Sequence, residues 1–245
     1  MNPQNSPVSP EPKTLNKPRN AASLILYRTG EADTEVLMGK RHLRAKFAPD
    51  IYVFPGGAVD RSDFSRPSGS VQHASHMGVG SNLALAHALA AAAIRETREE
   101  TGLALKPDTK FSCLQYLGRA ITPVFSPVRY HARFFAARAD QFEGDLQGDG
   151  ELHDLHWVPV ATALNYPLID VTTFMLEELQ RELTGTRVCY PLFTYYGRKP
   201  RVLYRLFQHR TACRRASTGR NNQGSTLSRL TTQPTAEGKL QSIAL

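Results

Sequence analysis

The stretch Arg95-Glu96-Thr97-Arg98-Glu99-Glu100-Thr101-Gly102-Leu103 decides how the rest of this chain is interpreted. Glu96, Glu99 and Glu100 are spaced at i, i+3 and i+4, so on a helix their carboxylates converge. Like charges this close destabilise an isolated helix by about a few tenths of a kcal/mol per pair. Clustered carboxylate oxygens are also the ligands that Mg²⁺ and Mn²⁺ prefer. The pattern therefore indicates either a metal site or an acidic patch that faces water.

A second motif, Tyr52-Val53-Phe54-Pro55-Gly56-Gly57-Ala58-Val59, lies upstream of the acidic stretch. Its aromatic and β-branched residues predict a strand, and residues 55–57 predict a sharp turn with exposed backbone. A strand end, a glycine turn with open carbonyls and an acid-faced helix together favour a site for a metal and a phosphate.

The two motifs resemble the Nudix hydrolase family, whose signature is Gly-x5-Glu-x7-Arg-Glu-U-x-Glu-Glu-x-Gly-U, where U is a bulky apolar residue. Residues 95–103 match the second half, with Thr97 where U is expected, and Gly57 would be the opening glycine. The resemblance implies an α/β (α+β) fold, a Nudix-type αβα sandwich with a mixed central sheet. It also implies hydrolysis of a diphosphate with Mg²⁺ or Mn²⁺ as the cofactor.

The spacing between the motifs departs from this signature. The family arginine follows its glycine by 14 positions, whereas Arg95 follows Gly57 by 38. About 24 residues are therefore inserted, and the segment 61–84, rich in Ser, Gly, Pro and His, is predicted to hold them as a loop. Counting back from Arg95 puts the first glutamate of the signature at His87, so that role stays unassigned.

The resemblance implies a role for each residue of the acidic stretch. Glu99 and Glu100 would be metal ligands, Glu96 a ligand or the general base, and the Gly57 carbonyl would complete the coordination shell. Arg95 would orient the carboxylates. Metal ions on a diphosphate neutralise its charge and lower the pKa of bound water, and a carboxylate that is not fully used as a ligand can take the proton.

Glu151 is a further catalytic candidate, because the family often recruits a late acidic residue before a tryptophan strand. Here that strand would be residues 155–159, and the alternative is a loop glutamate beside Asp149 and Asp154.

Substrate contacts are expected from the predicted strand 129–135. Period-two alternation puts Arg129, His131 and Arg133 on one face, where two guanidinium groups could hold phosphates. Gly56 is the third residue expected to bind the substrate. The same arginines could instead pair with acids on the sheet. His73 and His76 are either a metal pair or solvated loop residues.

The distribution of charge along the sequence limits which class of molecule the domain is expected to bind. The net charge is +8, but residues 1–20 carry +2 and residues 208–245 carry +5, so the segment between them is nearly neutral. We therefore predict a disordered arm (1–20), a Nudix domain (21–207, with its box turn at 55–57 and box helix at 84–102) and a disordered basic tail (208–245). Nucleic acid is not the expected partner of the domain.

Regular elements are predicted from periodicity. Two helices, 83–101 and 170–183, and seven strands are expected. The strands are 22–27, 35–40, 52–54, 115–122, 128–137, 153–158 and 201–207. Trp157 is expected in the core, and His87 is expected to pack on the helix surface.

Cysteine content, targeting signals and the inserted segment bear on location and substrate. Three scattered cysteines (Cys113, Cys189 and Cys213), no membrane span and no secretory signal favour the cytoplasm. A homodimer is allowed by the sequence. The insert and the strand motifs resemble the acyl-CoA diphosphatase branch, which implies CoA or its thioesters as substrates. ADP-ribose, dinucleotides, RNA ends and a non-catalytic regulatory module are the alternatives.

Overall fold

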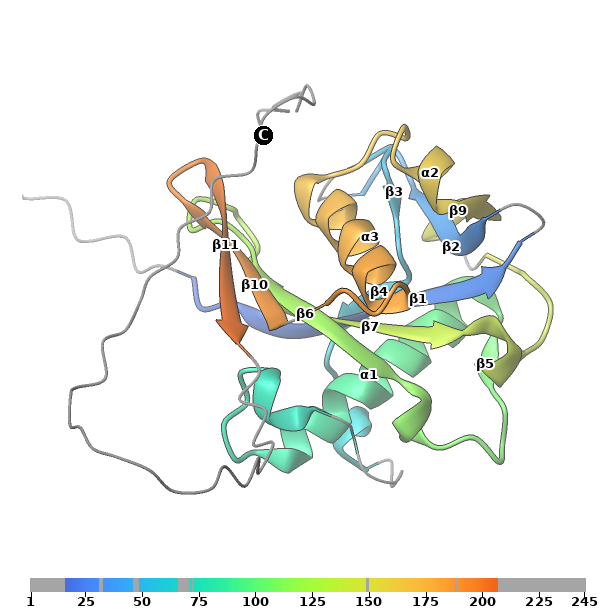
Figure 1. The fold of residues 1–245 in the computed structure, drawn as a ribbon, viewed down its shortest axis with the longest axis horizontal. Helices are drawn as coiled ribbons and strands as arrows, with labels where there is room; N and C mark the ends of the chain where they lie inside the picture. The colour runs from blue at the N-terminus through green and yellow to red at the C-terminus, as the bar shows by residue number, and fades with distance from the viewer. Residues whose placement is uncertain are drawn as a thin grey trace, which may run out of the picture. The chain divides into compact units, whose positions relative to one another are not determined.

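A computed structural model describes residues 16–30, 33–45, 49–65, 71, 73–148, 150–187 and 189–206 (Figure 1). The predicted tail (208–245) and most of the predicted arm lie outside these residues. The end of the arm does not, because the first strand begins at Arg19. Asn16 joins the folded part as well: its carboxamide donates to the Pro127 carbonyl at 3.2 Å, and its own carbonyl accepts from Arg129 at 2.9 Å.

A nine-stranded sheet forms the centre of the fold, in the order β11-β10-β6-β7-β1-β2-β3, with β4 also paired to β1 and β9 to β2. The β1–β7 and β6–β10 pairs are parallel and the other pairs antiparallel, so the sheet is mixed, as predicted. Its strands are β1 (Arg19–Thr29), β2 (Thr34–Arg41), β3 (Tyr52–Val53), β4 (Gly56–Ala58), β6 (Gln115–Ile121), β7 (Tyr130–Arg138), β9 (Leu152–Pro159), β10 (Cys189–Tyr196) and β11 (Lys199–Leu206). Two short strands, β5 (Ala104–Leu105) and β8 (Phe142–Glu143), pair separately.

Helices cover both faces of this sheet. Figure 1 shows α1 (Leu83–Thr101) on one side and α3 (Asp170–Leu183) on the other, which confirms the predicted αβα sandwich. A single-turn helix, α2 (Val160–Ala163), follows β9. Four short 3-10 helices complete the described elements: Arg61–Ser65, Ala74–His76, Phe111–Cys113 and Ala139–Gln141. None of the described helices is long and apolar enough to span a membrane.

Helix α1 owes its limits to its two caps. The Asn82 side chain accepts a hydrogen bond from the Leu85 N–H at 2.9 Å, which satisfies one donor of the first turn. Gly102 ends the helix in the left-handed region, with φ at 79°, and its N–H donates to the Arg98 carbonyl. The helix therefore places the acidic stretch in its last two turns, next to the glycine strand β4.

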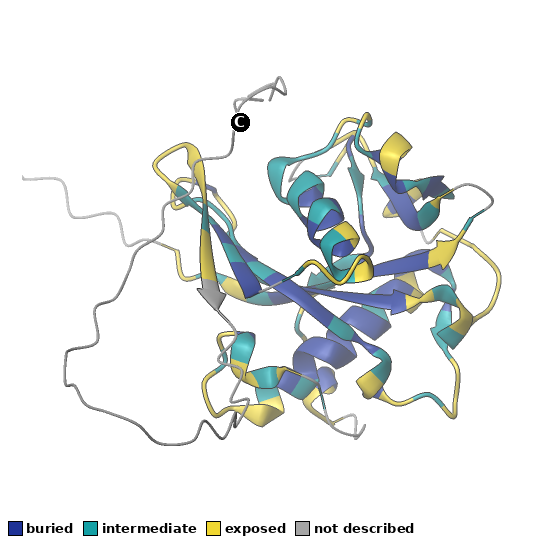
Figure 2. Cartoon of the chain, viewed as in Figure 1, coloured by how far each residue is buried: buried dark blue, intermediate teal, exposed yellow. Residues whose placement is uncertain are grey.

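Each face of the sheet has its own core (Figure 2). On the α1 side, buried alanines between Ala86 and Ala93 bring the helix close to Leu24, Leu26 and Phe135. On the α3 side, Met175, Leu176 and Leu179 pack on the opposite face of the same strands. Small side chains on α1 allow a short distance between helix and sheet, and this brings its glutamates within reach of β4.

Three local predictions differ from the structure. Residues 56–58 are not a free turn but the short strand β4, in which Gly57 lies opposite Ala22 of β1. The strand β10 was not predicted, because Pro191 interrupts its aromatic run and proline argues against an inner strand. The segment 61–84, predicted as a loop, holds two of the 3-10 helices.

The buried face of α1 gives a direct stability test. Leu89 is fully buried, whereas Leu83 on the same helix is 61% exposed. Leu89→Ala should lower the free energy of unfolding by about 2–5 kcal/mol, because it leaves a cavity in the core. Leu83→Ala should change it by less than about 0.5 kcal/mol. Urea unfolding followed by circular dichroism measures both, and equal effects would contradict the assigned core face.

Candidate active site

Arg95 is the centre of an ion-pair network at the end of α1. Its Nε and Nη2 atoms donate to the two carboxylate oxygens of Asp63 at 3.0 and 3.1 Å. Its Nη1 donates to Glu96 at 2.8 Å and to Glu99 at 2.9 Å, and Nη2 also reaches the Ala58 carbonyl at 3.0 Å. The bonds to Asp63 are the largest cause of a raised Arg95 pKa. One guanidinium thus fixes the helix, the end of β4 and the start of the insert.

Asp63 is a site residue that the sequence analysis missed. Its side chain is fully buried, and it lies six positions after Gly57, which is the spacing of glycine and first glutamate in the signature. Counting back from Arg95 stays within α1 and ends at His87, a half-buried residue in the first half of that helix, because the insertion lies between Asp63 and the helix. Counting forward from the glycine would have found Asp63. The inserted residues therefore begin after Asp63 rather than at residue 61.

Glu96 and Glu100 lie against the glycine strand. A Cβ atom at residue 57 would collide with the Glu96 carboxylate, so only glycine permits this approach. The Gly56 N–H donates to Glu100 Oε2 at 2.8 Å, so the backbone amide of Gly56 holds a carboxylate. Both contacts result from the β4–β1 pairing, which sets the position of the strand above the helix end.

Burial and mutual repulsion raise the pKa values of these two carboxyl groups. Glu100 is 4% exposed, and burial raises its pKa to about 8 against the lowering effect of the Gly56 N–H. Burial is also the first cause of the raised pKa of Glu96, where Arg95 acts in the opposite direction. The charge of Glu151 raises both values further. The negatively charged forms of both carboxyl groups are therefore disfavoured unless positive charge is brought close to them.

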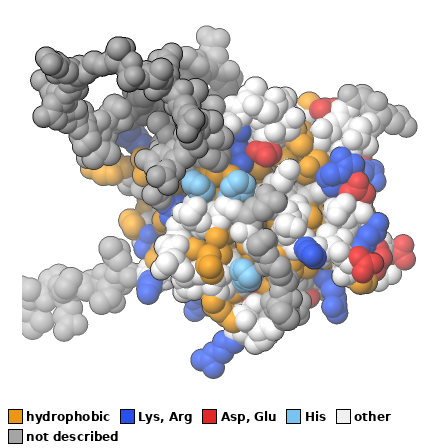
Figure 3. All heavy atoms as spheres, turned by 60° about the horizontal axis from the view of Figure 1, so that its bottom comes forward, with side chains coloured by type: hydrophobic (Ala, Val, Ile, Leu, Met, Phe, Trp, Pro, Cys, Tyr) orange, Lys and Arg blue, Asp and Glu red, His pale blue; other side chains and the backbone are white. Residues whose placement is uncertain are grey.

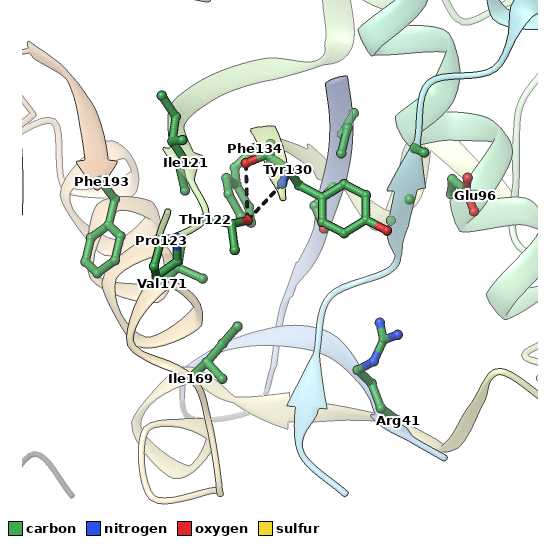
Figure 4. Close-up of a pocket in the computed structure, with 18 of the residues that line it drawn as sticks. Arg41, Glu96, Ile121, Thr122, Pro123, Tyr130, Phe134, Ile169, Val171 and Phe193 are labelled. Carbon is green, nitrogen blue, oxygen red and sulfur yellow. Dashed lines mark hydrogen bonds between the residues drawn. The ribbon is translucent and has the colours of Figure 1, made fainter. Parts of the chain in front are cut away.

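These groups form one end of a cavity of about 430 Å³, a volume suited to a small-molecule ligand (Figure 4). The charged end is lined by Arg41, Gly56, Gly57, Glu96, Glu100 and Glu151. The structure thus brings Glu151 to the wall that holds Glu96 and Glu100. Glu99 is outside this lining, with its side chain 53% exposed, and is joined to the site through Arg95.

Arg41 is a second residue that the sequence analysis did not single out. It ends β2 and lines the cavity at the charged end, where Figure 4 shows it on the same side as Glu96. Its Nε is buried and has no hydrogen-bond partner among the described residues. A buried guanidinium nitrogen without a partner is costly, so this atom is suited to an anionic ligand. The only signal in the sequence was a basic residue at a strand end.

The predicted substrate arginines do not face this cavity. Arg133 is buried on the α1 side of the sheet, where it donates to the carbonyls of Met77 and His131 and to the Asn20 carboxamide oxygen, at 3.1, 2.6 and 2.7 Å. Arg129 donates to the carbonyls of Thr122 and Asn16, at 3.3 and 2.9 Å. The other face of β7, with Tyr130, Ala132 and Phe134, lines the cavity. Residues alternate between the two faces as expected, and the face that carries Arg129 and Arg133 is not the one that lines the cavity.

The two histidines of the insert and the tryptophan of β9 pack against other side chains. The rings of His73 and His76 lie 5.1 and 4.6 Å from the Tyr190 ring, so the two residues pack the insert onto β10. Trp157 is partly buried against the α1-side core, and Arg28 lies over its ring at 4.5 Å.

Figure 3 shows the face of the molecule turned forward from the bottom of Figure 1, with basic side chains scattered over its visible part.

The fit of a divalent cation depends on the donors at the charged end. Glu96, Glu99, Glu100 and the strand carbonyls supply only oxygen, which suits Mg²⁺ or Mn²⁺. Within the described residues, no three His, Cys, Asp or Glu side chains gather around one point. Arg95 instead holds Glu96 and Glu99 in this arrangement. Because Glu96 and Glu100 lie close together and are largely buried, positive charge would be favourable between them, and the oxygen donors are chemically suited to a hard cation.

The ion pair of Asp63 can be tested by removing its charge. Asp63→Asn should lower the free energy of unfolding by about 3 kcal/mol, because it leaves Arg95 without its main partner in a buried position. Asp60→Asn is the matched control, because this neighbouring carboxylate is exposed and accepts from Ser62 in its own loop. Chemical denaturation of both variants is the measurement, and equal stabilities would argue against the network.

His131, on the face of β7 that is turned away from the cavity, predicts that the stability of the fold depends on pH. Burial, followed by the charges of Arg133 and Arg119, lowers the pKa of His131 from 6.5 to about 3. The resulting stability is complete above pH 6.5 and is lost as the pH falls toward 3, because only the unfolded chain then takes up the proton. Melting temperatures at pH 7.5 and 5 should differ less in His131→Gln than in the wild type. His153→Gln, at an exposed histidine, should behave as the wild type.

Comparisons with known proteins agree with this geometry. The family model of the NUDIX domain matches residues 17–178. A Caenorhabditis elegans protein provisionally named nudix hydrolase 7 is 29% identical over 165 residues, which are 67% of this chain and 45% of that protein. The chain thus spans about half the length of this relative. The crystal structure of a NUDIX hydrolase from Alicyclobacillus acidocaldarius aligns with a TM-score of 0.55 and 27% identity, over 66% of this chain and 91% of that one. The match to the family model, over more than half of the residues, shows that the chain belongs to the Nudix family.

Proposed function

We propose that this protein is a metal-dependent hydrolase that cleaves a diphosphate linkage in a nucleoside diphosphate derivative. The observation that carries the proposal is the charged end of the cavity, where Glu96, Glu100 and Glu151 meet Gly57 and Arg41. Carboxylates, an open backbone and a guanidinium on one wall match the charges of a diphosphate and the cations that accompany it.

The residues at the end of α1 and in β4 are the proposed metal ligands. Glu96 and Glu100, with Glu99 and the Gly57 carbonyl, would hold Mg²⁺ or Mn²⁺. The bound cations would neutralise the diphosphate and activate the attacking water. Arg95 keeps Glu96 and Glu99 on one side of the helix, where both carboxylates would turn toward the cations when the site is filled.

Two further side chains have proposed roles in charge and proton transfer. Arg41 would contact a phosphate oxygen, because its buried Nε otherwise has no partner among the described residues. Glu151 would take the proton of the attacking water, since it lies near the ligands without belonging to the helix. Water adds to one phosphorus, the bond to the bridging oxygen breaks, and two phosphate-ended products leave together with a proton.

Coenzyme A and its thioesters are the first substrates to test. The support for them is the resemblance of the long insert and the strand motifs to the acyl-CoA diphosphatase branch. ADP-ribose and dinucleotides have the same central linkage and belong in the same set. The nearly neutral charge of residues 21–207 favours small molecules over RNA ends.

A substrate panel with Mg²⁺, Mn²⁺ or EDTA tests the proposed function. We expect turnover that depends on the metal and falls by about 10²–10³-fold in Glu100→Gln and Glu99→Gln, because each removes a negatively charged ligand. Glu143→Gln is the control, since this exposed glutamate lies in β8, outside the cavity. Product analysis by mass spectrometry identifies the bond that is cleaved. Equal rates in wild type and Glu100→Gln would contradict the assignment.

A further inference from the structure

The cavity has a second end whose chemistry differs from the first. Figure 4 shows Ile121, Pro123, Val171 and Phe193 gathered on the side away from Glu96 and Arg41, with Ile169 below them. These residues come from the end of β6, the start of α3 and β10, so the apolar surface is built by three separate elements. Phe193 is 4% exposed and belongs to the α3-side core, which makes this wall a fixed part of the fold.

The polar groups at the apolar end are few and mostly used by the protein itself. The Thr122 hydroxyl accepts from the Tyr130 N–H at 2.9 Å and donates to the Tyr130 carbonyl at 3.2 Å. Burial, helped by the charge of Asp170, raises the pKa of Tyr195 to about 12, so its hydroxyl stays protonated. The described residues that line this end include no carboxylate and no carboxamide.

Tyr130 separates the two ends. It projects from β7 into the middle of the cavity, with its phenol oxygen directed toward the side where Glu96 lies (Figure 4). A ligand with its diphosphate at the carboxylates would therefore extend past this ring to the apolar wall. A single donor such as Tyr195 does not distinguish heterocycles, because a base edge is recognised by several donors and acceptors at once. Packing is the remaining source of selectivity there, worth about fourfold in affinity per buried methylene.

We propose that the apolar end holds an apolar or flat aromatic group carried by the diphosphate, and recognises it by packing rather than by its hydrogen-bonding edges. The inference rests on the proposed function and adds the class of group that this site selects. The face of a nucleobase and an alkyl chain share this chemistry, so the two sources are separated by the choice of substrates.

A series of diphosphate diesters with one constant methyl group tests the proposal. The second group is methyl, butyl or hexyl in one arm, and adenosine, guanosine or uridine in the other. We expect kcat/KM to rise by at least tenfold from methyl to hexyl if an alkyl chain is bound. If a base is bound, the three nucleosides should exceed methyl by at least tenfold and differ from one another by less than about threefold.

Variants of the wall connect this preference to the structure. Val171→Thr keeps the shape of the side chain but adds a hydroxyl, so the preference for the larger group should fall about fivefold. Ile121→Thr serves as a second variant in case one of them folds poorly, which circular dichroism would reveal. Val128→Thr is the control, because Val128 is exposed and lies outside the cavity lining. It should leave both the rates and the preference unchanged.

The outcomes separate this proposal from the proposed function. Metal-dependent cleavage of every diester at the same rate, with no effect of Val171→Thr, would contradict the proposed role of the apolar end. It would still support the proposed hydrolase activity. A preference of tenfold or more for one base would overturn recognition by packing as well. Cleavage of none of the diesters, of CoA or of ADP-ribose with either metal would count against the hydrolase itself.

Discussion

The guanidinium of Arg95 is the interaction on which the rest of the site depends. It makes five hydrogen bonds that connect α1 to Asp63, to the end of β4 and to two glutamates one helical turn apart. Without this positive charge, the carboxylates at the end of α1 would repel one another in a partly buried place. The same contacts hold Gly57 against Glu96. A single side chain thus ties the carboxylates of the site to the strand that the β4–β1 pairing positions above the helix.

The overall architecture could be predicted from the sequence because its signals are local. The limits of α1 were predicted to within one residue, since an alanine-rich run and Gly102 mark its body and its end. The αβα arrangement followed from the Nudix resemblance. Strand β10 was missed because its pairing with β6 and β11 outweighs the presence of Pro191, and no local pattern reports such a pairing. The glycine strand β4 was also not predicted, because it is defined by its pairing with β1 and not by a local sequence pattern.

The candidate site was predictable only in part. The cluster of glutamates was visible from helical spacing, and the approach of Glu151 agrees with its place before the tryptophan strand. Asp63 was hidden by an insertion that shifts the register of any count made from Arg95. For the arginines of β7, alternation separates two faces but does not say which face the cavity occupies. Burial decided this, because the Met77 carbonyl in the insert supplies a partner for Arg133 on the opposite side.

The contacts of the insert have a consequence for how the scaffold accommodates extra chain. At the beginning of the insert, Asp63 forms an ion pair with Arg95. Near its end, the carbonyl of the fully buried Met77 accepts a hydrogen bond from Arg133. The entropic cost of closing a chain between two fixed points grows only with the logarithm of the number of residues between them. Doubling that number would cost about 0.6 kcal/mol. Residues can therefore be gained or lost between these anchors with little effect on the position of the glutamates, so this is a place where the protein can diversify without rebuilding its chemistry.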